Sequence, residues 1–190
     1  ERGCMVDRVS ALATNYTKGY FEVDKKITLT FREIKDLYIK QIAAWPLTID
    51  AIDSKLANLM NTTNAPGFNQ SFSKDNKHVL RIEPLKWWII GDDTIETNSN
   101  EGAIIDLSHA FTSIEVRGES AKKFLNRHLP LDFRDDSFPN NYVASSAIHH
   151  VSVKVWKINQ GYRIFIPRGF ALSLWEIFLE TAHQFGYEIL

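Results

Sequence analysis

The sequence predicts an α+β domain in which an antiparallel-rich sheet carries helices on one face. Three observations predict this fold class. Strand-like segments with alternating apolar residues outnumber helical ones. Helical segments are interleaved with neighbouring strands and a hairpin, which is typical of α+β domains. The 190 residues, 44% of them hydrophobic, suffice for one domain with a substantial core.

The first elements are an arm, two strands and a helix. Residues 1–25 show no sustained period and predict a loosely ordered N-terminal arm, so that the single domain occupies residues 26–190. Alternating apolar residues predict a strand near 27–31, and a second strand over 36–45 ends at a proline. Apolar residues at spacings of three and four predict a helix over 48–60, with the threonine at its start as N-cap.

A polar loop over residues 61–77 precedes a strand over 78–93 that contains Trp87 and Trp88. Successive strand residues point to opposite faces, so these two tryptophans cannot share one core. Ile90 lies on the face of Trp88.

The strand face that carries Trp88 and Ile90 must be covered separately from the face of Trp87. Exposing a side chain that buries about 150–250 Å² forfeits several kcal/mol. The cover is either another segment of this chain or a partner protein. Trp156 stands in a similar position, opposite the valine face of its strand. We therefore take Trp88, Ile90 and Trp156 as candidates for a partner interface, with cover by the chain itself as the alternative.

The second half of the chain contains strands, helices and a hairpin. Strand patterns occupy residues 103–107 and 113–118, and a short helix follows over 119–130. Residues 152–167 predict a hairpin because two alternating strands flank a turn that ends in glycine. Residues 169–186 carry the clearest helical stripe, with a glycine at the position that follows a helix.

Composition excludes several classes of protein. The net charge is -1 and the basic residues are scattered, so we expect no nucleic-acid partner. Cys4 is the single cysteine, which excludes an internal disulfide and a zinc ribbon. Since the sequence shows no secretory h-region and no apolar run of 18 residues, we expect a cytoplasmic protein without a membrane partner.

The sequence contains none of the common catalytic motifs. No glycine-rich dinucleotide or phosphate loop is present. Asp106 and His109 fall on opposite faces of a strand, so this stretch cannot form a nucleophile–base chain. His149 and His150 diverge in the same way. A small-molecule site assembled from Asp106, His109 and His149 remains an alternative.

Two arginines stand out among the charged residues. Arg117 and Arg168 each lie beside a glycine before a predicted helix, where backbone N–H groups can bind anions. We count both as interface candidates, with ordinary surface charge as the other interpretation. Asp92 and Asp93 are interpreted as a solvated turn rather than an acid–base pair.

Five stretches together carry a family resemblance. They are ITLTFREIKDLYIKQIAAWP (27–46), RIEPLKWWIIG (81–91), AIIDLSHAFTSIEVRGESAKKFLNRHLPLDF (103–133), the hairpin of 151–167 and RGFALSLWEIFLETAHQFG (168–186). In this order they resemble the gamma subunits of heterotetrameric sarcosine oxidases. Those subunits are related to the folate-binding domain of glycine-cleavage aminomethyltransferases, for which the SIEVRGESAKKFL pattern is typical. The resemblance implies that fold, with ferredoxin-like elements.

The resemblance also implies a function. The holoenzyme of this family oxidatively demethylates sarcosine to glycine, forming hydrogen peroxide and methylenetetrahydrofolate. The alpha, beta and delta subunits would be the partners of this chain. FAD, FMN, NAD, zinc and tetrahydrofolate are expected in those subunits, and no cofactor is expected in this one.

No catalytic, cofactor-binding or metal-binding residue of this chain can be assigned from the resemblance. Two alternatives stay open. The chain could be a stand-alone folate-binding or aminomethyltransferase-like protein. It could also be the equivalent subunit of a dehydrogenase that acts on another N-methyl amino acid.

Overall fold

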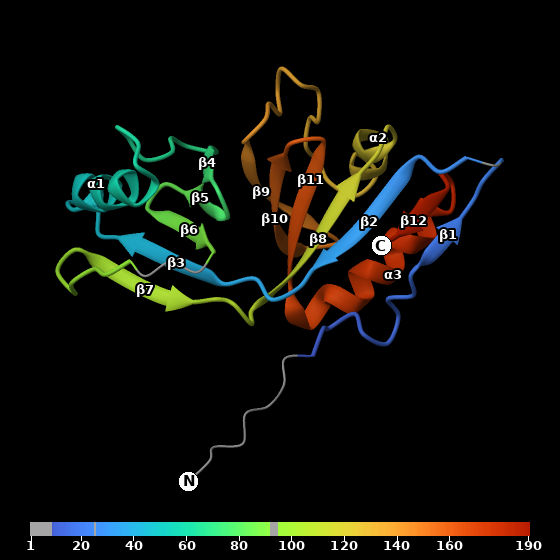
Figure 1. Cartoon of the computed structure of the whole chain (residues 1–190), viewed down its shortest axis with the longest axis horizontal. Coiled ribbons are helices and arrows are strands. Elements are labelled where there is room, and N and C mark those ends of the chain that lie inside the picture. The colour runs from blue at the N-terminus through green and yellow to red at the C-terminus, as the bar shows by residue number, and fades with distance from the viewer. Residues whose placement is uncertain (1–8, 25, 92–94) are drawn as a thin grey trace, which may run out of the picture.

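The computed structural model describes residues 9–24, 26–91 and 95–190, which form two sheets (Figure 1). The larger sheet has the strand order β1-β12-β2-β8-β11-β10-β9. Its strands are β1 (Gly19–Phe21), β2 (Leu29–Ile34), β8 (Phe111–Arg117), β9 (Val143–Ile148), β10 (Val151–Ile158), β11 (Gly161–Pro167) and β12 (Tyr187–Ile189). Pairing in this sheet is antiparallel except between β12 and β2.

The smaller sheet has the order β4-β5-β6-β3-β7, with antiparallel pairing throughout. Its strands are β3 (Ile39–Ala44), β4 (Ser71–Lys74), β5 (Lys77–Glu83), β6 (Lys86–Ile90) and β7 (Gly102–Asp106). All five come from one continuous stretch, which is inserted between β2 and β8 of the larger sheet. The predicted α+β class with antiparallel-rich sheets is confirmed, although the strands form two sheets rather than one.

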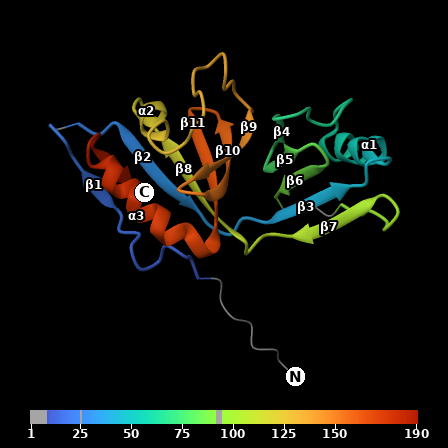
Figure 2. The same cartoon turned by 180° about the vertical axis from the view of Figure 1, so that it is seen from behind.

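Helices cover one face of each sheet. The helix α1 (Ile49–Met60) packs on the smaller sheet, whereas α2 (Ala121–Leu125) and α3 (Ala171–Ala182) lie against the larger one (Figures 1 and 2). A 3-10 turn, η1 (Arg168–Phe170), leads into α3. Among the described residues, no helix has the length and apolar character that crossing a bilayer requires.

The opposite faces of the two sheets meet in a hydrophobic cluster, which we call the junction cluster. Its buried members are Ile39, Leu80, Ile82, Trp88, Ile90, Val143, Trp156 and Phe165. The Trp88 ring centroid lies 4.7 Å from that of Phe111 and 5.3 Å from that of Phe165. The Trp156 indole N–H donates to the Ser71 hydroxyl oxygen across the junction at 2.7 Å.

Trp87 lies on the other face of β6, against α1. It belongs to a separate buried cluster that includes Ile52 and Leu56 of that helix. The prediction that the adjacent tryptophans serve two different cores is therefore confirmed.

The helix predicted over residues 48–60 is confirmed as α1, but Thr48 does not cap it through its side chain. The Thr48 hydroxyl donates instead to the backbone carbonyls of Trp45 and Glu101. Asn61 ends the helix in the left-handed conformation, with φ of 50°.

The strand predicted over residues 78–93 is two antiparallel strands, β5 and β6, joined by a turn at Pro84. The stretch predicted as loop, residues 61–77, contains β4. Ser73 and Lys74 of that strand are exposed, so it lacks the apolar alternation that identifies a half-buried strand. The predicted hairpin of 152–167 is confirmed as β10 and β11.

The N-terminal arm differs from the prediction in residues 9–23. Leu12 is fully buried, and the Tyr16 ring stacks on Trp175 of α3 at 5.3 Å between centroids. β1 then adds to the edge of the larger sheet by pairing with β12. These contacts are made with the C-terminal part of the chain, so a periodic pattern of apolar residues within the arm does not predict them. Residues 1–8 lie outside the described residues.

Candidate partner interface

Trp88, Ile90 and Trp156 were predicted as partner-interface residues, and this prediction is wrong. The exposed fractions of Trp88, Ile90 and Trp156 are 1%, 1% and 3%, because each side chain lies in the junction cluster. The alternative stated for the second tryptophan face, cover by the chain itself, is the one observed. These three residues hold the two sheets together and offer no surface to a partner.

Arg117 lies at the end of β8, where its guanidinium turns back to Glu115. The Arg117 Nη2 to Glu115 Oε2 distance is 3.0 Å, and Arg163 binds the other carboxylate oxygen. Burial acts to raise the pKa of Glu115, but the bonds and charges of Arg163 and Arg117 outweigh it and hold the pKa below its usual value. Arg117 therefore neutralises a buried carboxylate, while part of its side chain remains at the surface.

Arg168 lies in η1, where its guanidinium donates to the backbone carbonyl of Val9. Its own backbone N–H donates to the Ala110 carbonyl at 2.8 Å. The arginine thus ties the start of the described chain to the region before α3.

The side chains considered for catalysis do not converge. The Asp106 carboxylate accepts the Ser108 backbone N–H at 2.8 Å, and its bonds with Ser108 keep its pKa below the usual value. His149 and His150 form the exposed turn between β9 and β10, both at positive φ. Within the described part of the chain, no group of three His, Cys, Asp or Glu residues could hold a metal ion. Asp92 and Asp93 lie outside the described residues.

An exposed apolar segment that the sequence analysis missed lies between β3 and α1. It consists of Trp45, Pro46 and Leu47, and we call it the WPL loop. The exposed fraction of Trp45 is 46% and that of Leu47 is 98%. Large apolar side chains at the surface, tryptophan above all, are typical of protein-binding sites.

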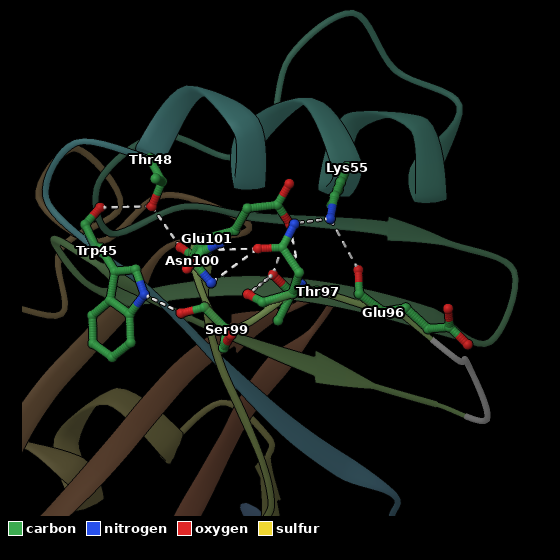
Figure 3. A network of polar contacts seen from close by, with 9 residues as sticks. Trp45, Thr48, Lys55, Glu96, Thr97, Ser99, Asn100 and Glu101 are labelled. Carbon is green, nitrogen blue, oxygen red and sulfur yellow. Dashed lines mark hydrogen bonds and ion pairs between the residues drawn. The ribbon is translucent and has the colours of Figure 1, made fainter.

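A network of polar contacts fixes the backbone around the WPL loop (Figure 3). At its centre the Glu101 carboxylate accepts hydrogen bonds from the Lys55 ammonium, the Thr97 hydroxyl and the Asn98 backbone N–H. Lys55 also donates to the Glu96 carbonyl at 3.2 Å. The hydrogen bond from Lys55, followed by that from Asn98, lowers the pKa of Glu101.

The same network orients the tryptophan. The Trp45 indole N–H donates to the Ser99 carbonyl at 2.9 Å, and its backbone N–H donates to the Glu101 carbonyl at 3.2 Å. In Figure 3 the indole extends to one side of the network, with its nitrogen turned toward Ser99. The Trp45 carbonyl accepts from the Thr48 hydroxyl, so the indole N–H and both backbone polar groups of Trp45 are bonded. Docking of a ring held in this way would cost little conformational entropy.

The two-sheet arrangement places the chain in a fold class shared with aminomethyltransferases. The crystal structure of the glycine cleavage system aminomethyltransferase T from Bartonella henselae superposes with a TM-score of 0.57 at 11% identity, over 87% of this chain and 48% of that one. The chain thus spans about half the length of that protein.

A closer match in size is a chain of the heterotetrameric sarcosine oxidase from Corynebacterium sp. U-96, solved in complex with pyrrole 2-carboxylate. The TM-score is 0.79 at 18% identity, over 94% of this chain and 96% of that one. The predicted resemblance to both groups of proteins is confirmed at the level of fold. No protein-family model and no curated protein matches the sequence.

Proposed function

We propose that the chain is a noncatalytic, gamma-type subunit of a heterotetrameric sarcosine oxidase. The observation that carries the proposal is the two-way coverage of the Corynebacterium chain: almost all of each chain is matched by the other. The two chains therefore share one architecture over their whole lengths. The assembly would oxidatively demethylate sarcosine to glycine, with formation of hydrogen peroxide and methylenetetrahydrofolate.

In this proposal the chain contributes a docking surface, and the redox chemistry belongs to its alpha, beta and delta partners. FAD, FMN, NAD, zinc and tetrahydrofolate would be bound by those subunits.

The WPL loop is the docking site that we favour. Leu47 is almost fully exposed, and the indole of Trp45 is held in one orientation by Ser99. A pre-oriented aromatic anchor with a neighbouring aliphatic side chain suits an apolar pocket on a larger subunit.

Co-expression with alpha-, beta- and delta-type chains tests the subunit proposal and the choice of the WPL loop as the docking site. We expect the wild-type chain to elute in a stoichiometric complex on gel filtration. Leu47→Asp should reduce the fraction in the complex at least tenfold, because docking would bury a carboxylate in an apolar pocket. Phe170→Asp serves as the control. This exposed aromatic residue lies in η1, which follows β11 of the larger sheet, whereas the WPL loop follows β3 of the smaller sheet.

A wild-type chain that stays monomeric beside its partners would overturn the subunit proposal. Loss of the complex with Phe170→Asp but not with Leu47→Asp would keep the subunit proposal and move the docking site to η1, at the start of α3.

A stand-alone folate-binding protein is the alternative that the aminomethyltransferase likeness favours. Calorimetric titration of the purified chain with tetrahydrofolate separates the two. Tight, stoichiometric binding by the isolated chain would favour the alternative, and a subunit of the proposed kind should show none. The identity of the N-methyl amino acid would follow from the turnover of the assembled complex.

A further inference from the structure

Lys157 is a buried lysine without a carboxylate partner. It lies near the end of β10 with an exposed fraction of 9%. Its ammonium donates to the Tyr162 hydroxyl oxygen at 3.1 Å and lies 4.2 Å from the centre of the same ring. No Asp or Glu of the described chain lies within ion-pair distance of it.

The surroundings increase the cost of this charge. Burial and then the nearby Lys122 ammonium lower the pKa of Lys157, while Asp135 acts in the opposite direction. The Asp135 carboxylate is itself bonded to Lys122 at 2.7 Å. A buried cation that is not compensated by an opposite charge destabilises a folded protein. An anion bound next to Lys157 would remove that cost.

The structure provides room for such an anion. A surface pocket of about 570 Å³ has Lys157, Tyr162, Arg117, Lys122 and Glu119 among its lining residues. Three of these residues are cationic: Arg117 is paired with Glu115 and Lys122 with Asp135, so Lys157 is the cation whose charge has no carboxylate partner among the described residues. Glu119, the acidic residue of the lining, is exposed to solvent. Its lining residues come from the segment where β8 leads into α2 and from the turn between β10 and β11. These elements are labelled in Figure 1.

Hydrogen-bond donors in the pocket suit an oxyanion. The Lys157 ammonium has three N–H donors, of which one is engaged by the Tyr162 oxygen. Burial, followed by the charge of Asp135, raises the pKa of Tyr162 to about 12. The phenol therefore keeps its proton at neutral pH and can donate it.

We propose that this pocket binds a small oxyanion, a phosphate or a carboxylate, through Lys157 and Tyr162, with Lys122 at its rim. This binding site is separate from the WPL loop and does not depend on the proposed subunit role. The negative group could belong to a free metabolite or to inorganic phosphate, because either presents the same oxygen atoms.

Calorimetric titration of the full chain at constant ionic strength tests the proposal, with inorganic phosphate in one arm and acetate in the other. We expect saturable one-site binding of at least one anion. The arm with the tighter binding identifies the chemical source. Lys157→Met should weaken that binding at least tenfold. Lys123→Met is the matched control because it also removes one lysine charge. Lys123 is an exposed residue of α2, next to Lys122 in the chain and outside the pocket lining.

A second variant and a second measurement distinguish a loss of anion binding from a loss of folding. Tyr162→Phe keeps the ring but removes the hydroxyl, and should weaken binding severalfold. In chloride, the thermal midpoint of Lys157→Met should equal or exceed that of the wild type, and phosphate should raise the wild-type midpoint more. Absence of saturable binding in both arms, or an equal loss of binding with Lys123→Met, would overturn the proposal.

Discussion

Replacing Trp88 with alanine tests the junction between the two sheets. A tryptophan buries about 150–250 Å², and at about 25 cal/mol per Å² its removal forfeits about 4–6 kcal/mol. Alanine retains the Cβ atom, and the site can partly collapse, so we expect Trp88→Ala to lower the free energy of unfolding by about 3–5 kcal/mol. The variant also loses the ring contacts with Phe111 and Phe165 and the hydrogen bond to the Gln41 side chain.

Urea denaturation followed by far-ultraviolet circular dichroism measures this loss without relying on tryptophan fluorescence. Trp87→Ala should cost a similar amount, because its ring is equally buried on the α1 side. Trp45→Ala is the surface control and should cost about 1 kcal/mol, the net value of one hydrogen bond. A loss below about 1.5 kcal/mol for Trp88→Ala, with the Trp87→Ala loss as expected, would refute internal cover of the second face.

Three further predictions concern a histidine, a glycine and the network at the WPL loop. Burial lowers the pKa of His128 to about 4 from its ordinary value of 6.5, so the unfolded chain takes up a proton first and stability should fall as the pH drops through this range. In pH-dependent urea titrations, His128→Phe should reduce that fall, and an unchanged profile would contradict it. Gly118→Ala should destabilise the protein by more than 1 kcal/mol in thermal melts, because φ is +108° and the added Cβ would lie 2.2 Å from the Thr28 carbonyl oxygen. Glu101→Gln should increase backbone hydrogen exchange in residues 96–101 while exchange in α3 stays constant, since the charge that binds Lys55 is removed.

Local patterns in the sequence predict the elements whose own side chains define them. The hairpin of β10 and β11 follows from alternation around a turn that ends in Gly161. The division of Trp87 and Trp88 between two faces follows from the period of a strand. Neither prediction needs knowledge of distant residues.

Contacts between distant segments explain what the sequence did not predict. The cover over Trp88 comes from Phe165 and other residues far along the chain. β12 has three residues and pairs in parallel with β2, so it has too little length for a periodic signal. The buried position of Leu12 likewise depends on α3 and the larger sheet.

The candidate docking site was missed for a different reason. Trp45 and Leu47 are apolar residues, and a sequence pattern places such residues in a core by default. Pro46, at the end of a strand, was interpreted as a stop signal, although a proline flanked by large apolar side chains before a helix also indicates an apolar turn. Exposure depends on the fold, so the structure was needed to identify this loop.

The insertion of the smaller sheet between β2 and β8 has a consequence for synthesis on the ribosome. Residues 39–106 carry all five strands of that sheet, so its backbone pairing can be completed while the rest of the chain is still being translated. Pairing of the larger sheet can be completed only after β12 has been synthesised. This strand lies between β1 and β2, although both of these are made first. Until β12 emerges, the nascent chain leaves one edge of β2 unpaired, and an unpaired strand edge is a template for aggregation.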